Sequence, residues 1–141
     1  MTGGRSFLDT NVLVYCHDRG EPRKRKQALA LLGSTDRDFV VSTQVLQEFY
    51  VTVVRKLAKP LDEASAEAAV RDLAQLPVVP VDTPMVLAAI ATSRAHDLSL
   101  WDALILQAAV AGGCKEVLTE DLQDGFKLGP VTVTNPFTRG K

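Results

Sequence analysis

Five acidic residues lie where a predicted strand ends or a predicted helix begins. They come from four separate stretches of the 141-residue chain: Asp9, Glu48, Asp102, Asp121 and Asp124. Ligands of open parallel sheets bind outside the carboxyl ends of the strands, so these side chains could converge on one edge of a sheet. Clustered carboxylates repel one another unless a cation or a shared proton relieves the repulsion. The residue types and their placement therefore indicate a divalent-metal site.

Such a site would suit Mg²⁺ or Mn²⁺, which prefer hard oxygen ligands and keep several bound waters. A bound ion lowers the pKa of a water, directs it at phosphorus and offsets the charge of a phosphodiester. Because the metal generates the hydroxide, this chemistry needs no histidine base. We therefore expect His17 and His96 to be ordinary polar residues.

Each acid also has a structural interpretation when it is taken alone. Asp9 could cap the helix that follows it, since it ends a strand directly before Thr10 and Asn11. Glu48 lies off the apolar stripe of its predicted helix, which is typical of a solvated side chain. Taken alone, Asp9 and Glu48 could therefore be either structural residues or parts of a metal site.

The remaining acids have equally simple alternatives. The stretch from Ser99 to Asp102 has the S-x-x-D pattern of a capping box, and an acid in a first turn suits the helix dipole. Asp121 and Asp124 could form a turn around Gly125. The case for a shared site therefore rests on the combination and not on any single acid.

Hydrophobic periodicity predicts strands that alternate with helices along the whole chain. The expected strands are residues 6–9, 38–43, 78–81, 116–119 and 131–137, and the expected helices are 10–18, 22–33, 44–58, 62–76, 83–96 and 99–113. The expected caps are Thr10 or Asn11, Ser42 or Thr43, and Thr83 before Pro84. Leu29, Ala30 and Leu32 are expected to form the apolar side of the 22–33 helix. This alternation predicts an α/β fold with a mostly parallel central sheet flanked by helices.

The composition fits one domain over residues 1–141, with 46% hydrophobic and 23% charged residues. The net charge of −1 supplies no global field for a polyanion. Cys16 and Cys114 lack zinc-site spacing and are expected to be buried or idle free thiols. With no secretory signal and no apolar run long enough for a membrane span, we expect a cytoplasmic protein without a membrane partner.

Four stretches resemble the signature blocks of a PIN domain, in the usual order and spacing. They read FLDTNVLVY, STQVLQEFYVTVVRK, LSLWDALILQAA and VLTEDLQDG, and the resemblance extends from about Ser6 to Pro136. The chain is most similar to the VapC-type ribonuclease toxins of bacterial type II toxin–antitoxin modules. The resemblance implies a single PIN-like domain, an α/β/α sandwich.

The resemblance also assigns roles to the acids. Asp9, Glu48, Asp102 and Asp121 match the catalytic acids. Of these, Asp9, Asp102 and Asp121 would be metal ligands, and Glu48 and Asp124 are further candidate ligands.

The implied activity is that of a Mg²⁺- or Mn²⁺-dependent endoribonuclease. Asn11 and Thr119 match polar positions that orient the acids or contact bound water and phosphate. The implied partners are an RNA substrate, a cognate antitoxin whose C-terminal segment lies across the active-site groove, and a second copy of the chain in a homodimer. Trp101 is expected in the core or at a dimer contact.

One dense basic run is available for RNA: Arg23, Lys24, Arg25 and Lys26. A basic run at the start of a helix opposes the helix dipole, so phosphate contact is one interpretation. A solvated face or a surface for the antitoxin is the other.

Three other functions compete with the toxin. A PIN fold could serve as an RNA- or protein-binding module without cleavage, or as a housekeeping RNA-processing nuclease. A phosphatase of the haloacid-dehalogenase type also begins with Asp after an apolar strand, but it requires D-x-D. Here Asn11 stands where the second carboxylate is needed.

Overall fold

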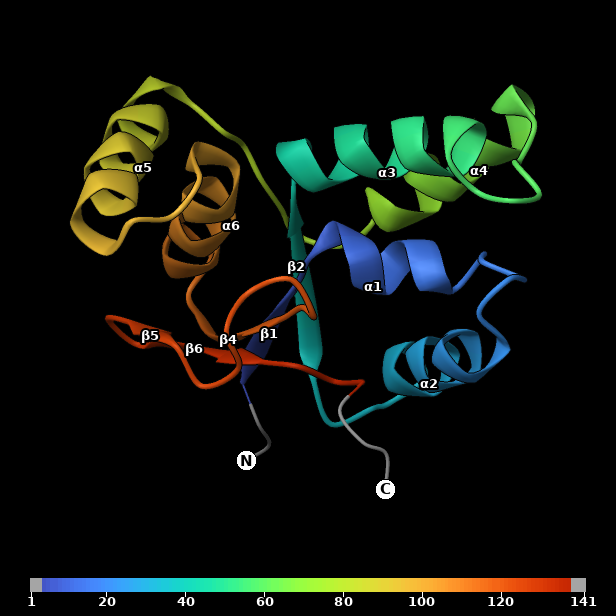
Figure 1. Cartoon of the computed structure of the whole chain (residues 1–141), viewed down its shortest axis with the longest axis horizontal. Coiled ribbons are helices and arrows are strands. Elements are labelled where there is room, and N and C mark those ends of the chain that lie inside the picture. The colour runs from blue at the N-terminus through green and yellow to red at the C-terminus, as the bar shows by residue number, and fades with distance from the viewer. Residues whose placement is uncertain (1–3, 138–141) are drawn as a thin grey trace.

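A six-stranded sheet forms the centre of the computed structural model, which describes residues 4–137 (Figure 1). Its strands are β1 (Arg5–Leu8), β2 (Asp38–Ser42), β3 (Val78–Val79), β4 (Cys114–Leu118), β5 (Lys127–Leu128) and β6 (Val131–Thr134). They lie in the order β3-β2-β1-β4-β6-β5. All neighbouring pairs are parallel except β5 and β6, which are antiparallel.

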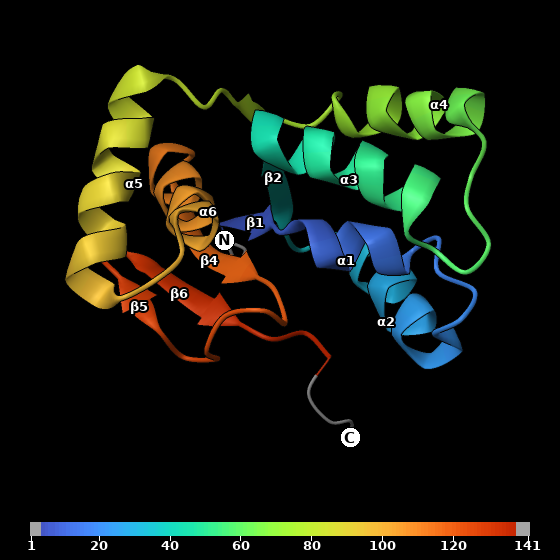
Figure 2. The same ribbon diagram turned by 45° about the horizontal axis from the view of Figure 1, so that its top comes forward.

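Helices cover both faces of this sheet. They are α1 (Thr10–Tyr15), α2 (Pro22–Leu32), α3 (Thr43–Arg55), α4 (Glu63–Leu73), α5 (Thr83–His96) and α6 (Leu100–Ala111). Figures 1 and 2 show α5 and α6 on one face and α1, α2, α3 and α4 on the other. The expected α/β fold with a mostly parallel sheet flanked by helices is therefore confirmed. Among the helices of residues 4–137, none combines the length and the apolar character needed to cross a membrane.

The core is built around β1, which lies between β2 and β4. Phe7 and Leu8 of this strand are fully buried, as a central strand with helices on both sides requires. On one face α6 contributes six buried apolar residues, from Ala103 to Ala109. On the other face Val45, Phe49 and Val53 of α3 recur at helical spacing and are almost completely buried. Packing on both faces thus fixes where β1 ends.

Two of the expected helix caps are wrong by one or two residues. The α1 helix is capped by Asp9, not by Thr10 or Asn11, and α5 is capped by Asp82, not by Thr83. In both cases the carboxylate residue has an extended backbone and accepts a hydrogen bond from the first turn, so the residue after it is already helical. The predicted cap of α3 is confirmed at Ser42.

The short elements at the sheet edges also differ from expectation. The third strand ends at Val79, before Pro80, which has no N–H to continue a ladder. The β5 strand was not expected, because two residues are too few for a periodic pattern. It pairs with β6 across a turn in which Gly129 has a φ of 56°, a conformation suited to glycine.

The expected apolar side of α2 is only partly correct. Ala28 is the one buried residue of this helix, whereas Leu29 is 46% exposed and Ala30 is exposed as well. The α2 helix packs against α1 and lies at the edge of its helical layer, so little of its surface is covered (Figure 1).

The cap of α5 gives a direct test of this structure. Replacement Asp82→Ala removes the acceptor of the Met85 N–H and should lower the free energy of unfolding by about 1 kcal/mol. The neighbouring replacement Thr83→Ala removes no capping group and should change it by less than about 0.5 kcal/mol. Urea unfolding followed by circular dichroism measures both values, and a larger loss in Thr83→Ala would contradict the observed cap.

Candidate active site

The adjacent ends of β1 and β4 bring Asp9 and Thr119 together. Leu8 pairs with Leu118, and the Asp9 N–H donates to the Leu118 carbonyl at 3.1 Å. Asp9 is only 5% exposed. Its Oδ2 accepts a hydrogen bond from Thr119 Oγ1 at 2.8 Å, and its Oδ1 accepts from the Thr10 N–H at 2.7 Å. A carboxylate is therefore held deep at the end of the central strand.

The hydrogen bonds around the Thr119 hydroxyl determine its direction. Thr119 Oγ1 accepts from Asn11 Nδ2 and from the Asp121 N–H, both at 3.0 Å. A hydroxyl oxygen has two lone pairs, and both are used by these donors. Its single proton is thus directed at Asp9, which must be the acceptor.

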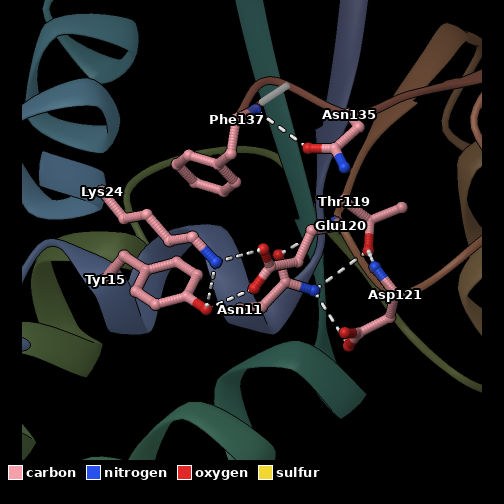
Figure 3. A network of polar contacts seen from close by, with 8 residues as sticks. All are labelled: Asn11, Tyr15, Lys24, Thr119, Glu120, Asp121, Asn135 and Phe137. Atoms are coloured by element: carbon pink, nitrogen blue, oxygen red, sulfur yellow. Dashed lines mark hydrogen bonds and ion pairs between the residues drawn. The ribbon is translucent and has the colours of Figure 1, made fainter. Parts of the chain in front are cut away.

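Asn11 connects the first turn of α1 to the segment that follows β4 (Figure 3). Its Nδ2 also donates to Asp121 Oδ2 at 3.0 Å, and its Oδ1 accepts from the Glu120 N–H at 3.3 Å. Asn11 and Thr119 thus contact the acids directly, while the expected role of these two residues in orienting the acids or contacting bound water and phosphate stays a prediction. The Asp121 carboxylate is positioned by the Asn11 amide.

Glu48 is half-buried and is held from two sides. Thr10 Oγ1 donates to its Oε1 at 2.9 Å, and Gln44 Nε2 donates to its Oε2 at 3.1 Å. Gln44 Nε2 also donates to the carbonyl of Trp101 at 3.3 Å, which ties α3 to the start of α6 beside Asp102. The interpretation of Glu48 as a solvated side chain is therefore wrong.

The charges of Asp121 and Glu48 act on both Asp9 and Asp102. Burial raises the pKa of Asp9 to about 6; hydrogen bonds from Thr119 and Thr10 oppose this rise, and the charges of Asp121 and Glu48 add to it. Partial burial also raises the pKa of Asp102, and the same two carboxylates contribute. The structure thus brings these acids within electrostatic range at one edge of the sheet.

The structural interpretations of the acids are correct in part. Asp9 caps α1 as well as facing the other acids, and Ser99 Oγ accepts from the Asp102 N–H at 3.0 Å as a capping residue does. Asp124 is different, because its Oδ1 accepts from the Asn135 N–H at 2.9 Å. It holds the turn before β5 to the end of β6 and does not contribute to the pKa shifts of Asp9 or Asp102.

A groove of about 690 Å³ opens beside these acids between α1 and α3. Glu48 and Asp121 line it, and so do Thr52 and Lys56 farther along α3. Eight residues of helix separate Glu48 from Lys56, which corresponds to about 12 Å. The groove therefore runs from Glu48 and Asp121 toward the C-terminal end of α3.

The basic run of α2 is partly used within the fold. Lys24 Nζ forms an ion pair with Glu120 Oε2 at 2.8 Å, and Arg25 Nε donates to the Cys16 carbonyl at 3.1 Å. Arg23 and Lys26 are exposed. The run is therefore not a uniform surface for phosphate.

The donor set fits a hard cation. Within residues 4–137, no three side chains among His, Cys, Asp and Glu already converge closely enough to hold a metal ion. Neutral Thr, Asn and Gln side chains donate to the carboxylates of Asp9, Glu48 and Asp121, and each accepting oxygen keeps a second lone pair beyond its hydrogen bond. Oxygen ligands around a buried acid of raised pKa suit Mg²⁺ or Mn²⁺.

Residues outside the site agree with expectation except one. Cys16 and Cys114 are buried free thiols, and burial raises the pKa of each to about 11. His17 and His96 pack edge-on against phenylalanine rings. Trp101 is 62% exposed, so its expected place in the core is wrong, while a dimer contact stays a prediction.

Sequence reasoning missed the residues that hold the acids. Thr10, Gln44 and Glu120 all contact the acids or their neighbours. Each lies within one of the PIN-like stretches, but the sequence assigned none of them a role in holding an acid. Thr10 and Gln44 lie near the starts of the helices that follow Asp9 and that carry Glu48. This placement is the one feature of the sequence that could have pointed to them.

Comparison with solved structures finds chains of the same fold. VapC20 of Mycobacterium tuberculosis, a toxin that cleaves the sarcin–ricin loop, is 21% identical, with a TM-score of 0.68 over 82% of this chain and 89% of its own. A toxin–antitoxin complex from Klebsiella pneumoniae contains a chain 20% identical, with a TM-score of 0.67 over 94% and 98%. VapBC2 of Rickettsia felis, bound to a DNA fragment from its promoter, is 18% identical, with a TM-score of 0.63 over 93% and 98%.

A search of curated proteins found no match to the sequence. The family model of the PIN domain matches residues 6–127. This range contains Asp9, Glu48, Asp102 and Asp121 together with the strands that position them. The chain therefore belongs to the PIN domain family.

Proposed function

We propose that this protein is a metal-dependent endoribonuclease that acts as the toxin of a toxin–antitoxin pair. The observation that carries the proposal is the buried Asp9 carboxylate, whose pKa is raised to about 6 next to Asp121 and Glu48. Clustered carboxylates repel one another unless a cation or a shared proton relieves the repulsion, and a bound cation is the relief proposed here. Membership of the PIN domain family supports a nuclease.

In this proposal Asp9, Asp102 and Asp121 are the metal ligands, and Glu48 completes the acidic set. Bound Mg²⁺ or Mn²⁺ would supply the charge that lowers the pKa of a water and offsets that of the phosphodiester. The chain's own contribution is orientation. Thr119 directs its proton at Asp9, and the amide of Asn11 holds the Asp121 carboxylate.

The proposed partners are RNA, a cognate antitoxin and a second copy of the chain, all in the cytoplasm. The structures from Klebsiella pneumoniae and Rickettsia felis are toxin–antitoxin complexes, which supports an antitoxin partner here. The groove along α3 is the proposed place both for the RNA and for an antitoxin segment that blocks it.

Replacement of one acid tests the proposed cleavage. Asp102→Asn removes the charge of a proposed ligand while the Ser99 cap of α6 stays in place. It should lower the cleavage rate by at least ~100-fold, since loss of an outer-shell partner alone can cost that much. The matched control is Asp124→Asn, which should retain activity because Asp124 serves a turn. Cleavage of labelled RNA and growth arrest after induction measure both variants. Full activity of Asp102→Asn would contradict the proposal.

The raised pKa of Asp9 predicts how metal binding depends on pH. Below its pKa of about 6 the carboxyl is protonated, and the metal must displace that proton. Mn²⁺ affinity should change little between pH 7 and 8 and should fall about tenfold at pH 5. Isothermal titration calorimetry at these pH values measures the affinity. Equal affinity at pH 5 and pH 8 would contradict the role of Asp9, and no binding at either pH would favour a PIN module that binds without cleaving.

The groove predicts which cation contacts RNA. Among the described residues that line the groove, Lys56 carries the positive charge. Lys56→Gln should weaken RNA binding and reduce the slope of log K against log salt by about 0.7, the value for one phosphate of a single strand. Lys59→Gln, which changes an exposed lysine outside the groove lining, is the control. Fluorescence anisotropy in the Asp102→Asn background measures the slopes, and equal slopes for both lysine variants would contradict the prediction.

A further inference from the structure

Lys24, Tyr15 and Glu120 form a polar network beside the acids that the proposed reaction does not use (Figure 3). Lys24 Nζ lies 2.8 Å from Glu120 Oε2, and the Tyr15 hydroxyl donates to Glu120 Oε1. Lys24 Nζ also donates to the Tyr15 hydroxyl at 3.3 Å and lies 5.0 Å from the centre of the Tyr15 ring. Both oxygens of Glu120 are thus held, one from α1 and one from α2.

This network is sheltered from solvent. The side chains of Lys24 and Glu120 are only 25% and 20% exposed. The Phe137 ring packs edge-on against Tyr15 with the ring centres 5.1 Å apart, and Phe137 itself is 5% exposed. Dissolved salt screens a partly buried ion pair less than it screens an ion pair at the exposed surface.

Glu120 occupies the middle of a three-residue segment that carries much of the site. Thr119 on one side donates to Asp9, and Asp121 on the other side faces Asn11. The β4 strand ends at Leu118, so Glu120 and Asp121 have no strand ladder. The place of this segment therefore depends on the hydrogen bonds of its own residues.

We propose that Lys24 is a positioning residue for the acidic site, acting through Glu120 on the segment from Thr119 to Asp121. Lys24 anchors Glu120 to α2, and Glu120 in turn fixes the backbone from which the Asp121 carboxylate and the Thr119 hydroxyl extend. This inference rests on the proposed function, because it assumes that Asp121 and Asp9 bind a metal ion. It assigns Lys24, an RNA-binding candidate by sequence, to the assembly of the site.

Replacement of Lys24 by a neutral residue changes metal affinity in opposite directions, depending on whether Lys24 acts only through its charge or by positioning Asp121. Removing a positive charge near a cation site should strengthen cation binding by Coulomb's law, and freeing the Glu120 carboxylate should strengthen it further. A positioning role predicts the opposite, because a displaced Asp121 is a poorer ligand. Loss of an outer-shell partner typically weakens metal binding 10- to 100-fold.

The experiment measures Mn²⁺ affinity by isothermal titration calorimetry at pH 7.5. Lys24→Met should weaken binding about tenfold. Lys24→Arg keeps the charge and the reach and should bind nearly as the wild type does. Lys26→Met removes an exposed lysine of the same helix and should not weaken binding. Urea unfolding of each variant is the control for folding, and Mn²⁺ affinity is compared at a temperature where every variant is fully folded.

A second variant keeps the test independent of Lys24 itself. Glu120→Gln should also weaken Mn²⁺ binding, and Lys24→Met should cause no further loss when it is combined with Glu120→Gln. Further loss in the double variant would show that Lys24 acts by another route and would overturn the proposal.

The outcomes distinguish this inference from the proposed function. If the wild type binds Mn²⁺ and Lys24→Met binds it equally well or more tightly, the positioning role is wrong and the metal site stands. The same holds if Lys26→Met is weakened as much as Lys24→Met. If the wild type binds no Mn²⁺, the proposed function is wrong and the inference is overturned with it.

Discussion

The hydrogen bond from Thr119 to Asp9 is the contact on which the arrangement of the acids depends. It exists because β1 and β4 are parallel neighbours and Leu8 lies opposite Leu118, so the next residue of each strand leaves the sheet at the same edge. The same hydroxyl accepts from Asn11 and from the Asp121 N–H, which fixes two more groups. A shift of one residue in this register would turn each side chain to the opposite face and separate all of them.

The fold bears a cost for this arrangement. A carboxylate that is 5% exposed loses most of its hydration, and two hydrogen bonds offset only part of that loss, as the raised pKa of Asp9 indicates. The stability that tolerates it comes from the buried apolar core, to which Phe7 and Leu8 of β1 belong. Here the central strand leads directly into this poorly hydrated carboxylate.

Much of the fold could be predicted because its signals are local. Apolar periodicity identified every helix and the longer strands, and the acids were found because they stand at element boundaries. The two-residue β5 strand gave no pattern, and the cap at Asp82 was missed because the neighbouring Thr83 offered equally good chemistry. Asp9, Thr10 and Asn11 were all possible caps of α1, and the sequence did not decide among them. The residues that hold the acids were hidden for another reason. Glu48 meets Thr10 across 38 positions and Lys24 meets Glu120 across 96, distances at which spacing carries no information.

The distance along the chain between the two halves of the site has a consequence for synthesis. Asp9 and Thr119 are separated by 110 positions, so the first strand is made long before its partner β4 exists. A nascent chain that ends before β4 contains Asp9, Glu48 and Asp102 but neither Thr119, which donates to Asp9, nor Asp121. Closing so long a loop is also slow compared with forming the helices within it. The acidic site is therefore completed only after β4 and Asp121 have been translated and β4 has paired with β1.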